Sequence, residues 1–389
     1  MSTFAIKAAK FVLPAAVMGE GYLTVRDGRF GTWSAEKPDC EIVDYSGKWV
    51  APGLVDTHIH GFFGHATTDN DPEGINISSA ELARCGTTSW LPTTFTQGAK
   101  DLGESCAAIA QADEERGPEF AGARIQGIYL EGPFFTTKHV GAQNPKFLID
   151  PSYEIFKGWQ KKAGGRIVKS ALAAEKPGAI EYISALDAEG VVTCLGHTDG
   201  TYDECVAAVN AGASCIVHTY NGQRGLHHRD PGVVGCAMAT PETYAEIICD
   251  GKHVVPAAIK ALVDAKGWQH VVLITDCLGC GGLPEGEYMS GGLRVVLKDN
   301  LCKLLNDDGT TGSIAGSVLT LARGVKNMVD WGIVTAEQAL RMGSEVAARS
   351  AKIDHKCGFI KPGRDADFIV LEPDMTLVDT YVGGVKIEK

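Results

Sequence analysis

Histidines and carboxylates follow several short apolar runs in this chain, and both residue types bind divalent metal ions. The set comprises His58 and His60 after the run 50–55, Glu131 after 125–130, His197 after 191–195, His218 after 215–217 and Asp276 after 271–275. His58 and His60 stand two residues apart in an extended segment, so their side chains point to one face and suit a single ion. The joint pattern predicts one metal site that several strand ends build together.

Short apolar runs alternating with helical stretches supply the elements that must position these residues. Each run is too short for a buried helix, and most are rich in Val, Ile or Leu, which favours strands. The expected strands are 50–55, 88–91, 125–130, 167–172, 191–195, 215–217, 245–249 and 271–275, and the expected helices are 78–85, 102–116, 179–189, 202–211, 254–266 and 317–331. The alternation predicts a parallel (β/α)8 barrel, in which the carboxyl ends of the strands converge on one site. An open doubly wound sheet is the alternative.

Local signals predict where the last helices begin and end. Ser317 is the expected N-cap of the helix over 317–331, and Gly332 is expected to end that helix. Thr335 and Gln338 are spaced as in a capping box, which predicts the start of one more helix.

Both ends of the chain differ from its middle. Residues 1–50 and 356–389 contain short alternating strands with glycine turns and little helix, and Asp27-Gly28 is a hairpin dipeptide. We therefore expect one discontinuous β domain built from both termini. The predicted fold class is α/β: a (β/α)8 TIM-like barrel over 51–355 with a small discontinuous β-sandwich domain from residues 1–50 and 356–389.

Composition excludes several classes of protein. Lys+Arg 36 against Asp+Glu 48 gives a net charge of −12, which argues against a nucleic-acid or anionic-membrane partner. No apolar run is long enough to predict a membrane span. The 12 cysteines are scattered and several stand in apolar runs, which indicates a reduced, intracellular protein, expected in the cytoplasm. The lone C-x-x-C pair, Cys277 and Cys280, is weak as a zinc or redox motif, and its role stays open.

At these residues the chain resembles a known family. Pro52-Gly53-Leu54-Val55-Asp56-Thr57-His58-Ile59-His60 resembles the opening strand of the amidohydrolase superfamily. Further motifs narrow the resemblance to the N-acetylglucosamine-6-phosphate deacetylase family: Leu130-Glu131-Gly132-Pro133-Phe134, Leu195-Gly196-His197-Thr198, His218-Thr219-Tyr220-Asn221, Asp250-Gly251-Lys252-His253, Ile274-Thr275-Asp276, Arg229-Asp230-Pro231-Gly232 and Ile314-Ala315-Gly316-Ser317. The motifs occur in order over almost the whole chain.

The resemblance implies roles for the metal site and the catalytic groups. Glu131, His197 and His218 match the family's core metal site, and His58 and His60 match the second site of members with two ions. One or two divalent ions per subunit are therefore expected, most simply zinc or iron, with cobalt or manganese as alternatives. Asp276 matches the catalytic acid and base, and His253 matches the group that polarises the N-acetyl carbonyl.

The resemblance also implies how substrate is bound. Asn221, Gly222 and Arg229 match the phosphate site, with Arg229 reaching over from the neighbouring subunit of a homodimer. Ala142 and Gln143 match a sugar-binding loop in which some members carry His instead of Gln. Ile314, Ala315 and Gly316 match the backbone wall beside the acetyl group. The implied reaction converts N-acetylglucosamine 6-phosphate and water to glucosamine 6-phosphate and acetate.

Three alternatives remain open at this point. The same motifs resemble members that deacetylate N-acetylgalactosamine 6-phosphate, which differs only at the 4-hydroxyl. A hydantoinase-like enzyme for cyclic amides would bridge two metals with a carboxylated lysine on the fourth strand, where Lys169 stands. A catalytically silent scaffold would be expected to lack Asp276 or His253, and this chain has both.

Overall fold

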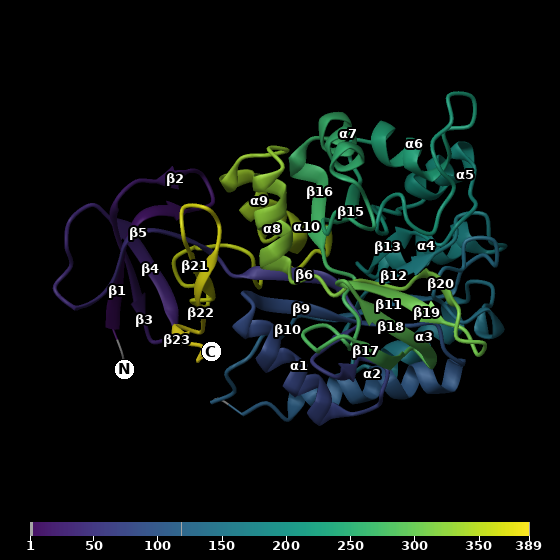
Figure 1. The fold of residues 1–389 in the computed structure, drawn as a ribbon, viewed down its shortest axis with the longest axis horizontal. Coiled ribbons are helices and arrows are strands. Elements are labelled where there is room, and N and C mark those ends of the chain that lie inside the picture. Colours follow the sequence, from purple (N-terminus) through teal and green to yellow (C-terminus); the bar gives the residue numbers. More distant parts are fainter. Residues whose placement is uncertain (1–2, 118, 389) are drawn as a thin grey trace.

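Parallel strands and the helices between them form a barrel in the middle of the chain (Figure 1). The structure is a computed structural model and describes residues 3–117 and 119–388. The barrel strands are β6 (Leu54–Ile59), β9 (Thr87–Thr94), β11 (Ile128–Phe134), β12 (Ile167–Leu172), β13 (Val192–Leu195), β14 (Cys215–Ile216), β15 (Tyr244–Ile248) and β16 (Val271–Ile274). They pair in this order, and the short β10 (Arg124–Ile125) pairs with β9. The predicted barrel is confirmed.

The barrel is closed by loop contacts beyond the last strand. The Asp276 amide donates to the His58 carbonyl at 2.9 Å, and the His60 amide donates to the Cys277 carbonyl at 2.8 Å. The first and last strand ends are thereby held side by side.

The first expected barrel strand, 50–55, is misplaced. Residues up to Pro52 belong to a strand of the terminal sheet, and the barrel strand begins at Leu54 after Gly53. A Cβ on Gly53 would lie 2.0 Å from the Thr88 hydroxyl oxygen, so the chain passes from one sheet to the other where only glycine fits.

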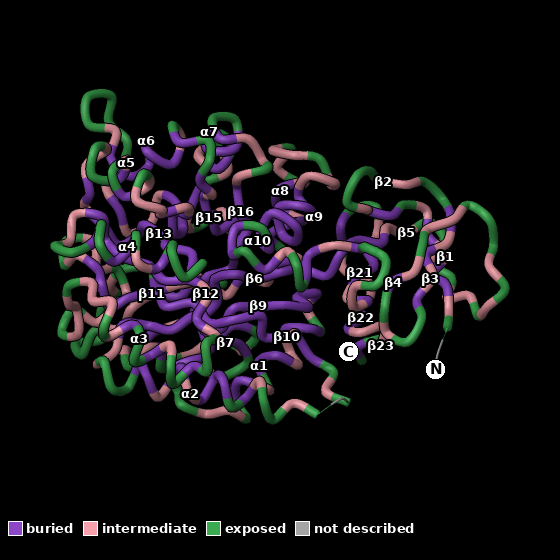
Figure 2. Tube along the Cα trace, turned by 180° about the vertical axis from the view of Figure 1, so that it is seen from behind, coloured by how far each residue is buried: buried purple, intermediate pink, exposed green. Residues whose placement is uncertain are grey.

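The outer layer consists of helices that follow the strands. It contains α1 (Pro72–Arg84), α2 (Ala99–Glu114), α3 (Tyr153–Lys162), α4 (Ala179–Ala188), α5 (Tyr202–Asn210), α6 (Gly232–Ala239), α7 (Pro256–Lys266), α8 (Leu321–Asp330), α9 (Ala336–Met342) and α10 (Glu345–Ser350). The capping box of Thr335 and Gln338 is confirmed at the start of α9. In Figure 2 the barrel strands are mostly buried, and exposed residues gather on the peripheral helices and loops.

The prediction that Ser317 caps the helix is wrong. Helix α8 begins at Leu321, after Thr320. The Ser317 hydroxyl donates to the Thr275 carbonyl and accepts from the Leu319 amide at 3.0 Å. Ser317 therefore ties its loop to the end of β16 instead of starting a helix.

Strands from both ends of the chain form one separate sheet (Figure 1). Its order is β23 (Val385–Lys386), β22 (Leu377–Val382), β21 (Phe368–Leu371), β5 (Glu41–Pro52), β1 (Thr3–Val12), β3 (Gly21–Arg26) and β4 (Arg29–Ser34), with β2 (Val17–Met18) on β1. The sheet curls, because the Phe30 ring on edge strand β4 lies 6.0 Å from the Phe368 ring on β21. The two ends of the chain thus share one core, as predicted.

A small antiparallel sheet that the sequence did not predict lies between β16 and α8. It contains β17 (Gly286–Ser290), β18 (Leu293–Lys298), β19 (Leu301–Leu305) and β20 (Thr311–Ile314). Phe95 and Leu278 pack in the same cluster as Val295 and Cys302 of this sheet. The inserted sheet therefore covers the loop after β16 and brings Ile314 to the mouth of the barrel. Among the described residues, no helix has the length and apolar character needed to cross a membrane.

Candidate active site

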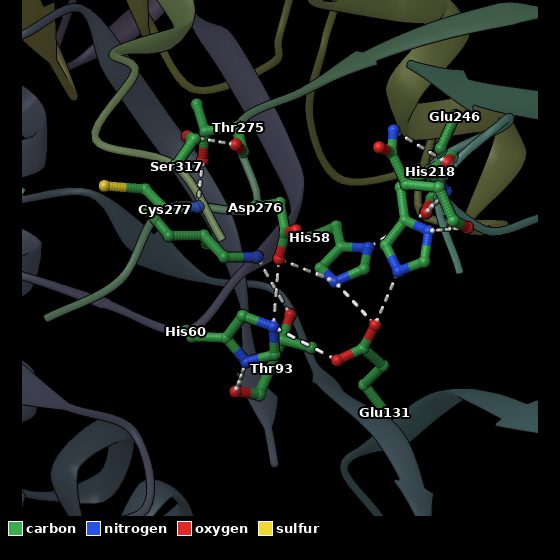
Figure 3. Close-up of polar contacts among 12 residues, drawn as sticks. His58, His60, Thr93, Glu131, His218, Glu246, Thr275, Asp276, Cys277 and Ser317 are labelled. Carbon is green, nitrogen blue, oxygen red and sulfur yellow. Dashed lines mark hydrogen bonds and ion pairs between the residues drawn. The ribbon is translucent and has the colours of Figure 1, made fainter. Parts of the chain in front are cut away.

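The predicted metal-binding and acid–base side chains meet at the carboxyl end of the barrel, and Figure 3 shows His58, His60, Glu131, His218 and Asp276 among them. His58 and Glu131 lie within strands β6 and β11, and His60 stands just past β6. His197, His218 and Asp276 follow β13, β14 and β16 with φ values of 45°, 23° and 51°. A non-glycine residue in this left-handed region costs on the order of 1–3 kcal/mol and persists only where its surroundings hold it. The strand ends therefore turn sharply to aim these three side chains inward.

Each of the four site histidines donates a hydrogen bond outward from Nδ1. The acceptors are the Thr93 carbonyl for His60 (3.1 Å), the His139 carbonyl for His197 (2.8 Å), the Asn221 carbonyl for His218 (3.0 Å) and Glu246 Oε2 for His58 (2.9 Å). A carbonyl only accepts, so Nδ1 must carry the proton and Nε2 is left with its lone pair. This arrangement is typical of metal-binding histidines.

All four Nε2 atoms converge on Glu131. His218 and His197 lie 3.0 and 3.3 Å from Glu131 Oε1, and His58 lies 3.4 Å from the same oxygen. His60 lies 3.2 Å from Glu131 Oε2. Two groups, Glu131–His197–His218 and His58–His60–Glu131, thus share one carboxylate, and all five residues are buried.

The donor set fits divalent cations. The Nε2 atoms of His197 and His218 are 3.2 Å apart, although both carry lone pairs when each ring donates from Nδ1. The buried Nε2 of His58 has no hydrogen-bond partner among the residues that the structure describes. A cation between these nitrogens and Glu131 satisfies atoms that would otherwise repel each other or stay unpaired.

Charge is balanced tightly around the same atoms. Burial would raise the pKa of the Glu131 carboxyl, but His58 and the close contacts with His197 and His218 hold that pKa well below its usual value. Burial would likewise raise the pKa of Asp276, but the charge of His58 and the contact with His60, 3.1 Å away, lower it. The carboxylates are thus ionised and face imidazoles, where a metal ion competes with protons for the nitrogen lone pairs.

A cavity of about 250 Å³ opens above this centre. Of the residues predicted to bind substrate, Ala142, Gln143, Asn221, Gly222, His253, Ile314 and Gly316 line it, together with Asp276. His253 donates from Nδ1 to Asp250 Oδ2 at 2.6 Å, and within the described part of the chain its buried Nε2 has no hydrogen-bond partner. That nitrogen is therefore free to meet a ligand in the cavity.

Two predicted substrate residues do not line the cavity. Ala315 is 1% exposed and packs beneath the inserted sheet, where its amide donates to the Cys302 carbonyl at 3.0 Å. Arg229 lies on an exposed loop, with its guanidinium 2.7 Å from His228 Nε2. Within one chain, Arg229 does not reach the site.

Gln143 contacts the carboxylate that the two ligand groups share, in addition to lining the cavity. Its Nε2 donates to Glu131 Oε2, and its Oε1 accepts from the Thr96 amide at 2.8 Å. Sequence reasoning also missed Phe95, whose ring stacks on His60 at 3.9 Å. Thr93 and Phe95 stand at and just after the end of β9, so the strand-end rule that found the histidines could have found them.

Lys169 takes no part in either ligand group. Its ammonium pairs with Glu246 Oε1, and both side chains are completely buried. Burial disfavours the charged lysine, yet Glu246 outweighs it and raises the pKa of Lys169. Burial disfavours the Glu246 carboxylate too, but Lys169 and His58 lower its pKa to about 2. The fourth-strand lysine is thus engaged with a carboxylate on β15.

Comparison with known proteins agrees with this geometry. The sequence profile of the amidohydrolase family matches residues 49–387. An N-acetylglucosamine-6-phosphate deacetylase of Vibrio furnissii is 39% identical over 86% of this chain and 82% of the relative. An N-acetylgalactosamine-6-phosphate deacetylase of Escherichia coli O157:H7 is 32% identical over 98% of each chain. A mutant N-acetyl-D-glucosamine-6-phosphate deacetylase of Mycobacterium smegmatis, solved in complex with N-acetyl-D-glucosamine-6-phosphate, superposes with a TM-score of 0.91 at 26% identity and covers 100% of both chains. The chain belongs to the amidohydrolase family, and the relatives named here are amino-sugar-phosphate deacetylases.

Proposed function

We propose that this protein hydrolyses the N-acetyl group of N-acetylglucosamine 6-phosphate, giving glucosamine 6-phosphate and acetate. The observation that carries the proposal is the convergence of four imidazole Nε2 atoms on Glu131 beneath a cavity that Asp276 and His253 also line. The names of the relatives supply the substrate class. Hydrolysis breaks the C–N bond of the amide; water supplies one of the two oxygens of the acetate, and its two protons go to the leaving nitrogen, which keeps its amide hydrogen and departs as an ammonium.

Glu131, His197 and His218 would hold one divalent ion, and His58 and His60 would hold a second with Glu131. Such an ion lowers the pKa of a water molecule toward about 7 and polarises a carbonyl oxygen. We propose zinc or iron, with cobalt or manganese as alternatives, because all four suit imidazole and carboxylate ligands.

Asp276 and His253 would perform the proton and charge chemistry. Asp276 lines the cavity beside His58 and His60, so it can accept the proton of the attacking water and deliver it to the leaving amine. Protonation matters because an amide anion is a very poor leaving group. His253 has an unpartnered Nε2 in the cavity and is held by Asp250, which places it to stabilise the developing oxyanion.

Substrate contacts would come from two chains. Asn221 and Gly222 line the cavity, and Gly222 has a φ of 59° where a Cβ would lie 2.9 Å from His197 Nδ1. Only glycine lets the backbone approach the site there. Arg229 lies outside the cavity of its own chain, which supports the proposal that it binds phosphate in the neighbouring subunit of a homodimer. Scattered buried cysteines support a cytoplasmic location.

N-acetylgalactosamine 6-phosphate is the second candidate substrate, favoured by the 32% identical relative that acts on this sugar. Metal-stripped protein, reloaded with one metal at a time, is assayed for acetate release from both phosphosugars, from unphosphorylated N-acetylglucosamine and from a cyclic imide. We expect turnover of a phosphosugar only after reloading, and kcat/KM ranks the two. Hydrolysis of the imide without acetate release from either phosphosugar would refute the proposal.

A further inference from the structure

A buried ion pair lies inside the barrel beneath the metal centre. Lys169 on β12 and Glu246 on β15 are each 0% exposed, and the Lys169 ammonium lies 4.4 Å from the centre of the Tyr129 ring. Removing two charges from water is costly, and well-packed apolar residues in their place are often as stable or more stable. Stability alone therefore does not account for the pair.

The second oxygen of Glu246 contacts the metal centre. Glu246 Oε2 accepts from His58 Nδ1 at 2.9 Å, and the backbone amide of His218 lies 3.3 Å from the same oxygen (Figure 3). The other three site histidines donate to backbone carbonyls, so His58 alone has a carboxylate as its acceptor. A carboxylate acceptor fixes the ring and strengthens the opposite nitrogen as a ligand.

We propose that Glu246 is a positioning residue that holds His58 with Nε2 directed at Glu131, and that Lys169 is the fixed counter-charge that anchors Glu246. This inference rests on the proposed two-ion centre. It assigns the fourth-strand lysine a role other than that of a carboxylated ligand.

The contacts of Lys169 oppose its carboxylation. Carboxylation joins carbon dioxide to a neutral amine nitrogen, releases a proton and leaves an anionic carbamate. That anion would stand where the ammonium now contacts Glu246 Oε1, and it would face a carboxylate without a counter-charge. Like charges at such a distance inside a protein repel strongly.

Three variants separate positioning from folding. Glu246→Leu alone would leave the buried ammonium of Lys169 without its counter-charge, so Glu246 is replaced together with Lys169. Lys169→Met/Glu246→Leu removes both charges and the acceptor for His58. Lys169→Met/Glu246→Gln removes both charges but keeps a neutral acceptor, and Lys169→Met alone keeps the carboxylate. Metal-stripped proteins are titrated with Zn²⁺ against a chromophoric chelator, and melting temperatures of the metal-free forms report folding.

We expect two zinc equivalents in the wild type and in Lys169→Met, but one site of Lys169→Met should bind more weakly because Glu246 has lost the charge that anchors it. In Lys169→Met/Glu246→Leu the His58–His60–Glu131 site should lose about 10- to 100-fold in zinc affinity. The affinity of the Glu131–His197–His218 site should not change. Lys169→Met/Glu246→Gln should recover part of that loss, which a purely structural role would not produce.

Four outcomes would overturn the inference. Unchanged affinity at both sites of the Leu variant would show that Glu246 does not position His58. Equal weakening of both sites with a lowered melting temperature would assign the pair to folding. Equal loss of one zinc from all three variants, with no recovery in Lys169→Met/Glu246→Gln, would identify the lysine as a ligand. A wild type with a single zinc site would instead refute the two-ion centre of the proposed function, and the inference with it.

Discussion

Replacing Asp276 by Asn tests the proposed acid and base most sharply. Asn keeps the shape of the side chain and an oxygen that accepts hydrogen bonds, but it cannot take a proton from water. Asp276 has a φ of 51°, and Asn adopts this left-handed region with little strain, so the loop should keep its conformation. The proposed core ligands Glu131, His197 and His218 are untouched.

The expected loss can be worked from the position of Asp276. Its Oδ1 lies 3.1 Å from His60 Nε2 and 3.4 Å from His58 Nε2, where the proposed attack occurs. One positioned acid or base contributes about 10²–10⁴ in rate. Because Asp276 would both accept and return the proton, we expect kcat to fall by nearly the upper value of that range, about 10⁴. Such a loss corresponds to an activation barrier higher by about 5 kcal/mol.

Acetate release and metal content are measured together. We expect Asp276→Asn to retain its core metal ion and to lose kcat with little change in KM. The matched control is Asp264→Asn on the exposed side of α7, where the side chain pairs only with Lys260, and it should match the wild type. An Asp276→Asn enzyme with normal metal content and a rate within tenfold of the wild type would refute the assigned role.

Further predictions concern the metal, the glycine, the dimer and the ion pair. Removal of the metal with a chelator should abolish turnover and lower the melting temperature. Zinc added at a thousand times its Kd should raise the free energy of unfolding again by about 4 kcal/mol, and a melting curve that chelation leaves unchanged would contradict this. Gly222→Ala should weaken zinc binding, because the new Cβ would press on His197 Nδ1 from 2.9 Å, and normal affinity would count against that reading. The variants Arg229→Ala and Asp276→Asn should each have low activity as homodimers. If Arg229 acts across the dimer, mixing the two subunits should restore activity, because one site of the mixed dimer has both native residues; no recovery would show that Arg229 does not act in the neighbouring site. The pKa of Glu246 is depressed from 4.5 to about 2, so its stabilisation is present above pH 4.5 and lost as pH falls toward 2. Urea unfolding of the metal-free wild type should therefore lose more stability over that pH range than Lys169→Met/Glu246→Leu, and parallel curves would refute this.

The barrel and the convergence of its histidine and glutamate side chains could be predicted because their signals are local. Buried parallel strands form continuous apolar runs, and parallel topology brings residues such as Glu131, His197 and His218 together whatever their spacing in sequence. The first strand was misplaced because Val50 to Val55 form one apolar stretch in sequence, although Val50 to Pro52 and Leu54 to Val55 belong to different sheets.

The inserted sheet was missed although its turns carry a signal. Gly291-Gly292 and Asp299-Asn300 are two-residue turns with positive φ values, flanked by alternating strands, which is the pattern of hairpins. At Ser317, by contrast, a clear local signal led to a wrong prediction. A serine before an apolar periodic run fits an N-cap, but tertiary contact with Thr275 decides its hydrogen bonds.

Side-chain pairing inside the barrel could not be predicted from one sequence. Lys169 and Glu246 are 77 residues apart, and nothing local distinguishes a lysine that pairs with a carboxylate from one that binds metal. The contact of Gln143 with Glu131 likewise depends on how the loop before η1 (Pro145–Phe147) folds over the cavity.

Anomalous diffraction from zinc-soaked crystals tests the central claim most directly. The account predicts a strong peak within about 2.0–2.2 Å of ligand atoms from Glu131, His197 and His218, and a second peak beside His58, His60 and Glu131. Zinc bound elsewhere in the molecule, with no peak among Glu131, His197 and His218, would contradict it.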